Sequence, residues 1–199
     1  MATPNIAGIT TLIRQHLVES YPDLDKVQIN ELLYRLMMST ATIANNEDGD
    51  PYSPRKQGAG LADILNTLNT KAYLYVEGSN KTKIELGDDP KRTGLYALRF
   101  RIANLSAEER AYDLSGMVMS EKMSVDGITV AERAYMFDDA EITLVGAGEG
   151  VARKGNRITL VPNADAELTV QLRLTDADKR YLNEHFANGM YVEGYLKLA

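Results

Sequence analysis

The chain has 199 residues, of which 44% are hydrophobic and 25% charged, so it is long enough to bury a core as one or two domains. Its formal net charge of -6 argues against a nucleic-acid partner, which would require clustered Lys and Arg. Cysteine is absent, which excludes a disulfide framework, a thiolate nucleophile and a cysteine-based metal site. No apolar run reaches the length of a membrane span, and the first residues lack the basic-then-apolar order of a signal peptide.

A helix is predicted over residues 1–19. Thr3 suits the cap of such a helix and Pro4 its first turn, where the missing N–H of proline costs nothing. Apolar side chains recur at three- and four-residue spacing and form one stripe, which must be buried: Ile6, Ile9, Leu12, Ile13 and Leu17. Ala7 and Gly8 are small residues within this stripe, so we expect another backbone to pass close to them.

A second amphipathic helix is predicted after the break at residues 21–25, where a proline is followed by cap-type residues. Its apolar positions again follow helical spacing: Ile29, Leu32, Leu33, Leu36 and Met37. A short third helix with one apolar side is predicted behind residues 57–60, which read Gln-Gly-Ala-Gly: Leu61, Ile64, Leu65 and Leu68. We expect the two glycines to permit a tight passage of the backbone.

The loop of residues 45–54 is rich in oxygen-bearing side chains, which invites a calcium hypothesis. An EF-hand requires Gly at the sixth position and Glu at the twelfth, where this chain has Asp50 and Lys56. The EF-hand is therefore excluded. A solvated loop is the preferred interpretation, and no metal ligand is assigned.

The period changes from helical to alternating at about Lys71, which marks the strongest domain boundary in the sequence. Short strands are predicted at residues 72–76, 82–86, 95–102, 112–119, 140–145, 157–161, 167–174 and 190–198. Gly116 is a possible bulge, and residues 120–137 show no clear pattern. A helical turn capped by Thr175 and reaching His185 is predicted before the last strand. The fold class is therefore α+β, and the strands favour a two-sheet sandwich.

Few residues suggest chemistry. Only His16 and His185 offer a base that titrates near neutral pH, and no serine stands in a nucleophile-elbow setting, so surface or capping roles are preferred for both histidines. The run at residues 146–150 lacks the Lys-Ser/Thr of a phosphate loop and predicts a glycine-rich hairpin. The paired acids at residues 88–89 and 138–139 lie beside predicted turns. The eleven tyrosines, mostly in alternating strands, favour packing over carbohydrate binding.

Two motifs resemble segments of the subtilisin-like serine proteases, or subtilases. Residues 1–8, Met-Ala-Thr-Pro-Asn-Ile-Ala-Gly, resemble the segment that follows the nucleophilic serine and opens the long central helix, with Asn5 where the family usually has His. Residues 57–64, Gln-Gly-Ala-Gly-Leu-Ala-Asp-Ile, are similar to the segment that closes the catalytic domain. The region after residue 71 resembles the first fibronectin type III-like domain of the cell-envelope subtilases, the lactocepin and C5a-peptidase group.

The resemblance implies that residues 1–70 are the C-terminal helices of a subtilisin-like α/β catalytic domain and that residues 71–199 are an all-β fibronectin type III-like sandwich. It also implies that the nucleophilic serine lies immediately before Met1, with the His, Asp and oxyanion Asn farther upstream. Within the chain, no catalytic, cofactor-binding or metal-binding residue is therefore assigned. The intact enzyme would be an extracellular or cell-wall-associated endopeptidase acting on proteins or peptides, whereas this chain alone is expected to be inactive.

In that family the first two helices pack against a parallel sheet, which this chain lacks. We therefore expect their apolar stripes to face water or a partner such as the upstream catalytic domain, and the sandwich to outlast the helices under proteolysis. Two alternatives remain open. In the first alternative, the chain is a complete non-enzymatic module that binds protein or polysaccharide at the cell surface. In the second, it is a small α+β cytoplasmic protein with an unrelated site. The coding sequence upstream of Met1 separates these hypotheses.

Overall fold

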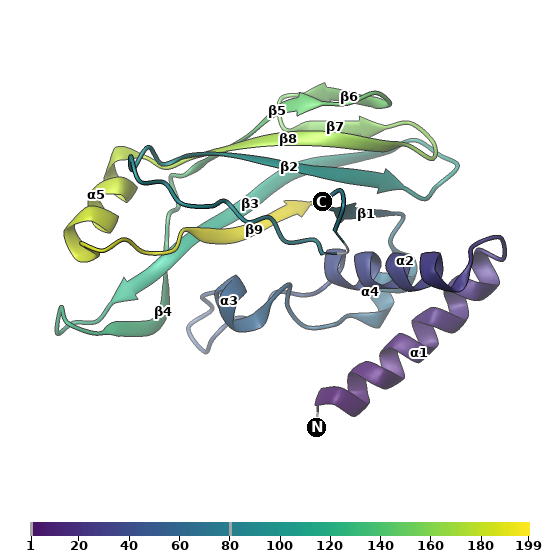
Figure 1. The fold of residues 1–199 in the computed structure, drawn as a ribbon, viewed down its shortest axis with the longest axis horizontal. Helices are drawn as coiled ribbons and strands as arrows, with labels where there is room; N and C mark the ends of the chain where they lie inside the picture. Colours follow the sequence, from purple (N-terminus) through teal and green to yellow (C-terminus); the bar gives the residue numbers. More distant parts are fainter. Residues whose placement is uncertain (1, 80) are drawn as a thin grey trace.

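A computed structural model describes residues 2–79 and 81–199, which form a mixture of helices and antiparallel strands (Figure 1). The helices are α1 (Ala2–Ser20), α2 (Lys26–Ser39), α3 (Pro54–Gln57), α4 (Ile64–Asn69) and α5 (Asp176–His185). The strands are β1 (Ala72–Tyr75), β2 (Leu95–Asn104), β3 (Arg110–Met123), β4 (Val130–Met136), β5 (Glu141–Ala147), β6 (Val151–Lys154), β7 (Arg157–Leu160), β8 (Asp165–Arg173) and β9 (Glu193–Leu198). The chain is therefore α+β, with α1 to α4 first and the strands after them, and with α5 between β8 and β9.

The strands form two sheets that face each other across one apolar core. One sheet has the order β1-β2-β8-β5, and the other has the order β4-β3-β7-β6 with β9 paired to β3. The long strand β3 carries the second sheet, since it pairs with β7 near its start, with β9 along its middle and with β4 near its end. Both sheets contribute to the core: Phe100, Ile102, Leu114, Leu144, Ile158, Leu160, Leu168 and Val170.

The alternation that predicted the longest strand is confirmed in β2. Phe100 and Ile102 are buried in the core, whereas Ala97 and Arg99 on the other face are exposed. This is the result expected of a strand with one buried face, because successive side chains point to opposite sides. The predicted helical turn before the last strand is also confirmed, since the Thr175 side chain accepts a hydrogen bond from the Asp178 N–H and caps α5.

One strand prediction was wrong, and two other regions differ from the sequence analysis. Residues 82–86 form no strand, although their side chains still alternate between half-buried and exposed. Residues 120–137, where the sequence shows no pattern, hold the end of β3 and the whole of β4. Gly116 is in regular register opposite Leu196, and the bulge lies instead between Glu121 and Met123. Gly116 is needed for space, because a Cβ there would approach the Tyr195 carbonyl oxygen to 2.6 Å.

The sequence predicted a hairpin at the glycine run of residues 146–150, and this prediction was wrong. The run is a crossover between the two sheets. It connects β5, which pairs with β8, to β6, which pairs with β7. Gly150 has a positive φ of 81°, a backbone conformation that glycine adopts without strain. The crossover therefore needs its glycines to redirect the backbone.

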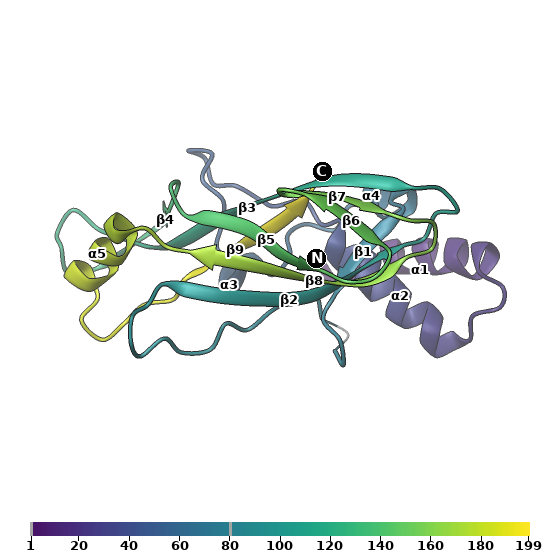
Figure 2. The same ribbon diagram turned by 90° about the horizontal axis from the view of Figure 1, so that it is seen from above.

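The helices α1, α2 and α4 lie together beside the strands, and α5 lies at the opposite end of the molecule (Figures 1 and 2). Contrary to the expectation that the stripes of α1 and α2 face outward, most of their large apolar side chains bury one another: Ile13, Leu17, Ile29, Leu32, Leu33 and Leu36. Ile64 and Leu68 of α4 and Tyr73 of β1 pack against this cluster. The helices thus have a small core of their own.

The helical core is fastened to the first sheet through the end of α2. The Ser39 hydroxyl accepts a hydrogen bond from the Leu74 N–H (2.9 Å) and donates one to the Leu74 carbonyl (3.1 Å). Arg35, one turn earlier, lies over the ring of Tyr75 with its guanidinium carbon 4.3 Å from the ring centroid. These contacts satisfy the outer edge of β1 and seat the helix on it.

Among the described residues, no helix is both long enough and apolar enough to cross a membrane.

Candidate functional site

The beginning of α1 is the segment to which the sequence assigns most function, and it projects from the rest of the molecule (Figure 1). Residues 3–8 are all exposed, and a Cβ on Gly8 would meet no other atom within 4 Å. The expectation that another backbone passes close to Ala7 and Gly8 was therefore wrong within this chain. Thr3 is inside the first turn rather than its cap, because the helix already includes Ala2. Met1, and the serine predicted before it, lie outside the described residues.

The exposure of α1 changes along its length. Ile13 and Leu17 are buried against α2, whereas Ile6 and Leu12 have 42% and 56% of their surfaces exposed. The apolar stripe read from the sequence is thus covered at Ile13 and Leu17, partly covered at Ile9, and open at Ile6 and Leu12. An uncovered apolar surface at one end of a helix is a surface that another part of a protein can bind.

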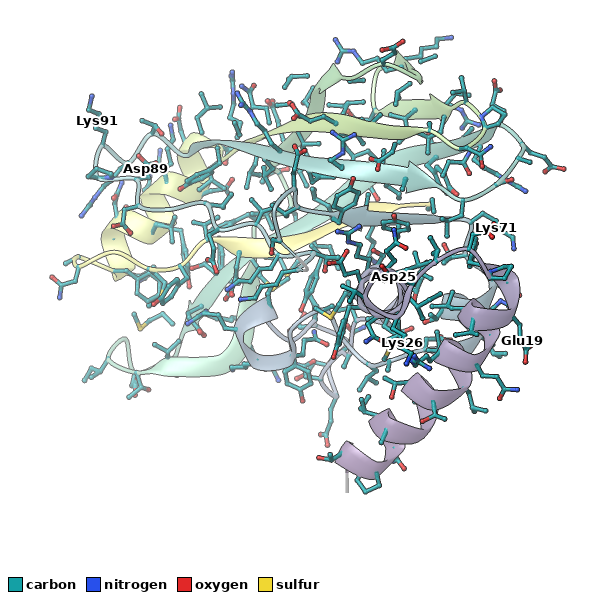
Figure 3. The ribbon with its side chains drawn as sticks, turned by 45° about the vertical axis from the view of Figure 1, so that its right-hand side comes forward. Glu19, Asp25, Lys26, Lys71, Asp89 and Lys91 are labelled. Carbon is teal, nitrogen blue, oxygen red and sulfur yellow. The ribbon has the colours of Figure 1, made fainter. Side chains whose placement is uncertain are left out.

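The start of α2 is fixed by a capping box formed by Asp25, a residue that Figure 3 labels, and Gln28. The Asp25 carboxylate accepts hydrogen bonds from the N–H groups of Val27 (2.7 Å) and Gln28 (2.9 Å). The Gln28 side chain returns a bond by accepting from the Asp25 N–H (2.9 Å). This arrangement fixes where α2 begins and hence how its apolar side meets α1.

The segment at residues 57–60 holds the connection between α2 and α4 in place. The Gln57 side chain donates hydrogen bonds to the carbonyls of Ala44 (3.0 Å) and Tyr52 (2.6 Å), and it accepts one from the Ala44 N–H (2.8 Å). Gly60 has a φ of 124°, and a Cβ there would collide with the Thr42 carbonyl. The tight passage expected of this motif is confirmed at Gly60. The clamp made by Gln57 was missed, since nothing in the sequence shows which loop its amide reaches.

The two histidines lie far apart on separate helices and form no catalytic group. His16 is exposed on α1, with its Nε2 3.4 Å from the Ser20 hydroxyl and no carboxylate bonded to it in the described part of the chain. His185 is exposed in the last turn of α5, and its ring lies 4.8 Å from that of Tyr181. A serine triad requires a histidine oriented by a carboxylate toward a serine, and neither site provides that arrangement.

The acidic loop of residues 45–54 is organised by a turn. The Asn46 side chain accepts hydrogen bonds from the N–H groups of Asp48 (3.0 Å) and Asp50 (2.9 Å), and the Asp48 carboxylate pairs with Arg133. Over residues 2–79 and 81–199, no three acidic or histidine side chains gather closely enough to hold a metal ion. The loop geometry is accounted for by these backbone contacts.

The paired acids also lie at turns, as predicted. Asp138 and Asp139 follow β4 in an exposed turn. Asp89, at the end of the molecule opposite Glu19 in Figure 3, accepts hydrogen bonds from the Gly94 N–H (2.8 Å) and the Thr93 hydroxyl (3.0 Å). Hydrogen bonds from Thr93 and Gly94 hold the pKa of Asp89 below its usual range. Of these four residues, Asp89 thus has a role in shaping its loop.

Arg55 is the most heavily bonded side chain between the helical part and the second sheet, and no pattern in the sequence points to it. Its guanidinium donates two hydrogen bonds to Glu193 of β9 from Nε (3.1 Å each), and Nη2 donates to Glu193 (2.9 Å) and to Glu121 of β3 (2.6 Å). The same group lies 4.2 Å from the ring centroid of Tyr191. Hydrogen bonds to Glu193 raise the pKa of Arg55. Three segments therefore meet at Arg55: α3, β3 and the stretch that leads into β9.

Several of the tyrosines pack within sheets and between parts of the chain, as predicted. Tyr135 and Tyr181 stack with ring centroids 3.6 Å apart, and the Tyr181 hydroxyl donates to the Glu121 carbonyl (3.0 Å). The Tyr195 hydroxyl on β9 donates to the Tyr52 carbonyl (3.0 Å) in the helical part, and burial raises the pKa of Tyr195 to about 12. These contacts use the polar end of the ring for anchoring and its body for packing.

In comparisons with known proteins, nearly the whole chain is similar to bacterial proteases. The chain is 23% identical over 198 residues to a C5a peptidase of Streptococcus pyogenes serotype M3. The matched region is 99% of this chain and 15% of the relative. It is 26% identical over 208 residues to a PII-type proteinase of Lacticaseibacillus paracasei and 25% identical over 209 residues to one of Lactococcus lactis subsp. cremoris. The chain resembles part of two kinds of bacterial protease.

Each of these relatives is much longer than the chain. The two PII-type proteinases are covered over 10% of their length, although 98% of this chain takes part in each match. No family model matches the chain. The similarity therefore relates the whole of this chain to a small part of each protease.

Proposed function

We propose that the chain is the C-terminal part of a subtilisin-like serine endopeptidase of the cell-envelope kind. The observation that carries this proposal is the similarity to C5a peptidase over 198 residues, which runs through the helices and the strands alike. A similarity confined to the strands would fit a detached binding module equally well. Continuity from α1 to β9 favours a segment that spans the end of a catalytic domain and the domain that follows it.

The structure of α1 supports this proposal at the place where the chemistry would occur. In the parent enzyme the serine lies immediately before Met1, ahead of a helix whose first N–H groups have no intrahelical partner and favour developing negative charge. The exposed side of residues 3–8 would then face the remainder of the catalytic domain, which supplies His, Asp and the oxyanion Asn. None of these groups belongs to residues 1–199, so this chain alone is inactive.

The division into two parts belongs to the same proposal. Residues 1–70 are the closing helices of the α/β catalytic domain, and residues 71–199 are a fibronectin type III-like sandwich. The Arg55 network and the contact of α2 with β1 support a fixed orientation of one part on the other. In this arrangement the sandwich supports the catalytic domain or contributes to binding of protein or peptide substrates, at the cell wall or outside the cell.

The coding sequence directly upstream of Met1 tests the proposal. An in-frame Gly-Thr-Ser at that point, with Asp and His motifs farther back, is the expected result. Replacing that serine with alanine in the whole gene product should abolish peptide hydrolysis, while residues 1–199 alone should hydrolyse nothing. A stop codon and ribosome-binding site before Met1 would contradict the proposal and favour a non-enzymatic cell-surface binding module.

A further inference from the structure

The strand β9 has one unused edge. Asp113 of β3 and Ala199 exchange backbone hydrogen bonds of 2.8 and 3.2 Å, which fixes the odd-numbered peptide groups of β9 toward β3. The N–H and C=O groups of Gly194, Leu196 and Leu198 therefore point to the opposite edge. In the described part of the chain these groups have no hydrogen-bond partner. A free strand edge is a template for a further strand.

A cavity of about 2320 Å³ adjoins this edge. It is lined by β9, by the segment of residues 82–89 and by core residues of both sheets, including Phe100 and Tyr112. The cavity is open to solvent and continues past residues 38–43 and 186–191, so it has the shape of a groove rather than of an enclosed pocket. Leu196 and Leu198 pack against the core but remain only half-buried.

The segment of residues 82–89 forms the other wall without closing the gap. Thr82, Ile84 and Leu86 are half-buried, whereas Lys83 and Glu85 are exposed, so the segment presents one side to the cavity. No backbone group of residues 82–88 is hydrogen-bonded in the described part of the chain. Both walls thus offer unused donors and acceptors, and a strand between them could use either set.

We infer that this cavity is the place of one further β-strand, supplied by polypeptide of the same protein outside residues 1–199 and paired with the outer edge of β9. The strand alternates, with apolar side chains directed at Phe100 and Tyr112. A permanent occupant is favoured over a passing substrate because Leu196 and Leu198 of β9 pack against the core but stay half-buried beside the cavity, so an apolar strand there would complete their burial. The inference rests on the proposed function only in taking the chain as part of a longer protein, as its 15% share of C5a peptidase suggests.

Amide hydrogen exchange, resolved to single residues, tests this inference in the gene product from its own source and in residues 1–199 alone. In residues 1–199 the amides of Gly194, Leu196 and Leu198 should exchange quickly, and in the gene product they should be slower by at least about tenfold. Tyr195 and Lys197 are internal controls, since their amides face β3 and should be slow in both samples.

Three results would overturn the inference: a gene product with no residues outside 1–199, outward amides equally fast in the gene product, or outward amides already slow in residues 1–199. In the third case, if the slow exchange is lost on dilution, the occupant is a second copy of the chain. If the slow exchange persists on dilution, the occupant is the segment of residues 82–89. The outcome is separable from the proposed function. A gene product that hydrolyses peptides but leaves the outward amides fast would refute the strand alone, and protected amides in a product without hydrolysis would refute only the protease.

Discussion

At the scale of single residues, the side chains with the clearest roles are those that fix the backbone. Asp25 satisfies two N–H groups at the start of α2, Gln57 clamps a loop, and Gly60 allows a close passage beside Thr42. Tyr75 joins β1 to Asp165 and Arg101 through its hydroxyl. Each of these roles depends on a single residue, so each can be tested by one substitution with another residue as control.

Replacing Asp25 with alanine should lower the free energy of unfolding by about 1 kcal/mol, because two N–H groups of α2 lose their acceptor. Urea unfolding followed by circular dichroism measures this change. The control is Asp23→Ala, since Asp23 is exposed two residues earlier and makes no side-chain hydrogen bond in the described part of the chain. An equal loss in both variants would contradict the capping role.

Tyr75 should make the protein less stable at high pH. Burial, followed by the hydrogen bond to Asp165, raises the pKa of Tyr75 from 10.0 to about 12 in the folded chain. The folded state therefore holds this proton more tightly than the unfolded state. The resulting stability is fully present below pH 10 and is lost as the pH rises toward 12.

The variant Tyr75→Phe removes this titration, so its stability should fall less steeply between pH 10 and 12 than that of the unmodified chain. Some decline should remain, because Tyr195 also has a pKa of about 12. Denaturant unfolding at a series of pH values gives both slopes. Tyr34→Phe is the control, since Tyr34 is exposed on α2, and a matching change in that variant would refute the role of Tyr75.

At the scale of elements, the contacts that hold α3 against the second sheet are concentrated in Arg55. Replacing it with methionine keeps most of the aliphatic stem but removes the hydrogen bonds to Glu193 and Glu121. The network is partly exposed, so the loss of global stability should be no more than about 1 kcal/mol. The larger effect should be faster amide exchange in the backbone of residues 45–58, with Lys56→Met leaving exchange unchanged. Equal exchange in the two variants would show that Arg55 does not anchor α3.

Element patterns were predictable to the extent that side chains repeat with a simple period. The stripes of α1 and α2 and the alternation of β2 identified those elements, and the cap residues Asp25 and Thr175 marked two helix starts. Residues 82–86 alternate equally well but form no strand, because pairing depends on a neighbouring edge that periodicity does not report. The crossover at residues 146–150 was missed for a related reason, since a glycine-rich turn does not show which sheet receives the next strand.

Limited proteolysis should separate the two parts of the chain. The sandwich buries a large shared core, whereas the helices have a smaller core and the first half of α1 is exposed. Cleavage should therefore begin in the helical part and trim toward residue 70, leaving a resistant fragment of about residues 71–199. Mass spectrometry of the fragments identifies the boundary, and equal resistance of both halves would contradict the division.

At the scale of the whole molecule, the candidate site is defined by a surface rather than by catalytic groups. The sequence assigned no catalytic residue to the chain, and in the described part of it Asp25, Asp89 and Gly60 serve local structure. What the sequence alone could not supply was the pattern of exposure: α1 is covered at Ile13 and Leu17 but open at Ile6 and Gly8. That pattern depends on the crossing of α1 with α2 and α4, which is a tertiary property.

The central claim is that α1 opens directly behind a reactive serine hydroxyl. A fluorophosphonate probe, which labels activated serines covalently, tests it when the whole gene product is labelled, digested and mapped by mass spectrometry. The account predicts one labelled serine, in the residue that immediately precedes Met1 of this sequence, and no label on residues 1–199 alone. A label at any other position, a label on the isolated chain, or a gene that begins at Met1 would contradict it.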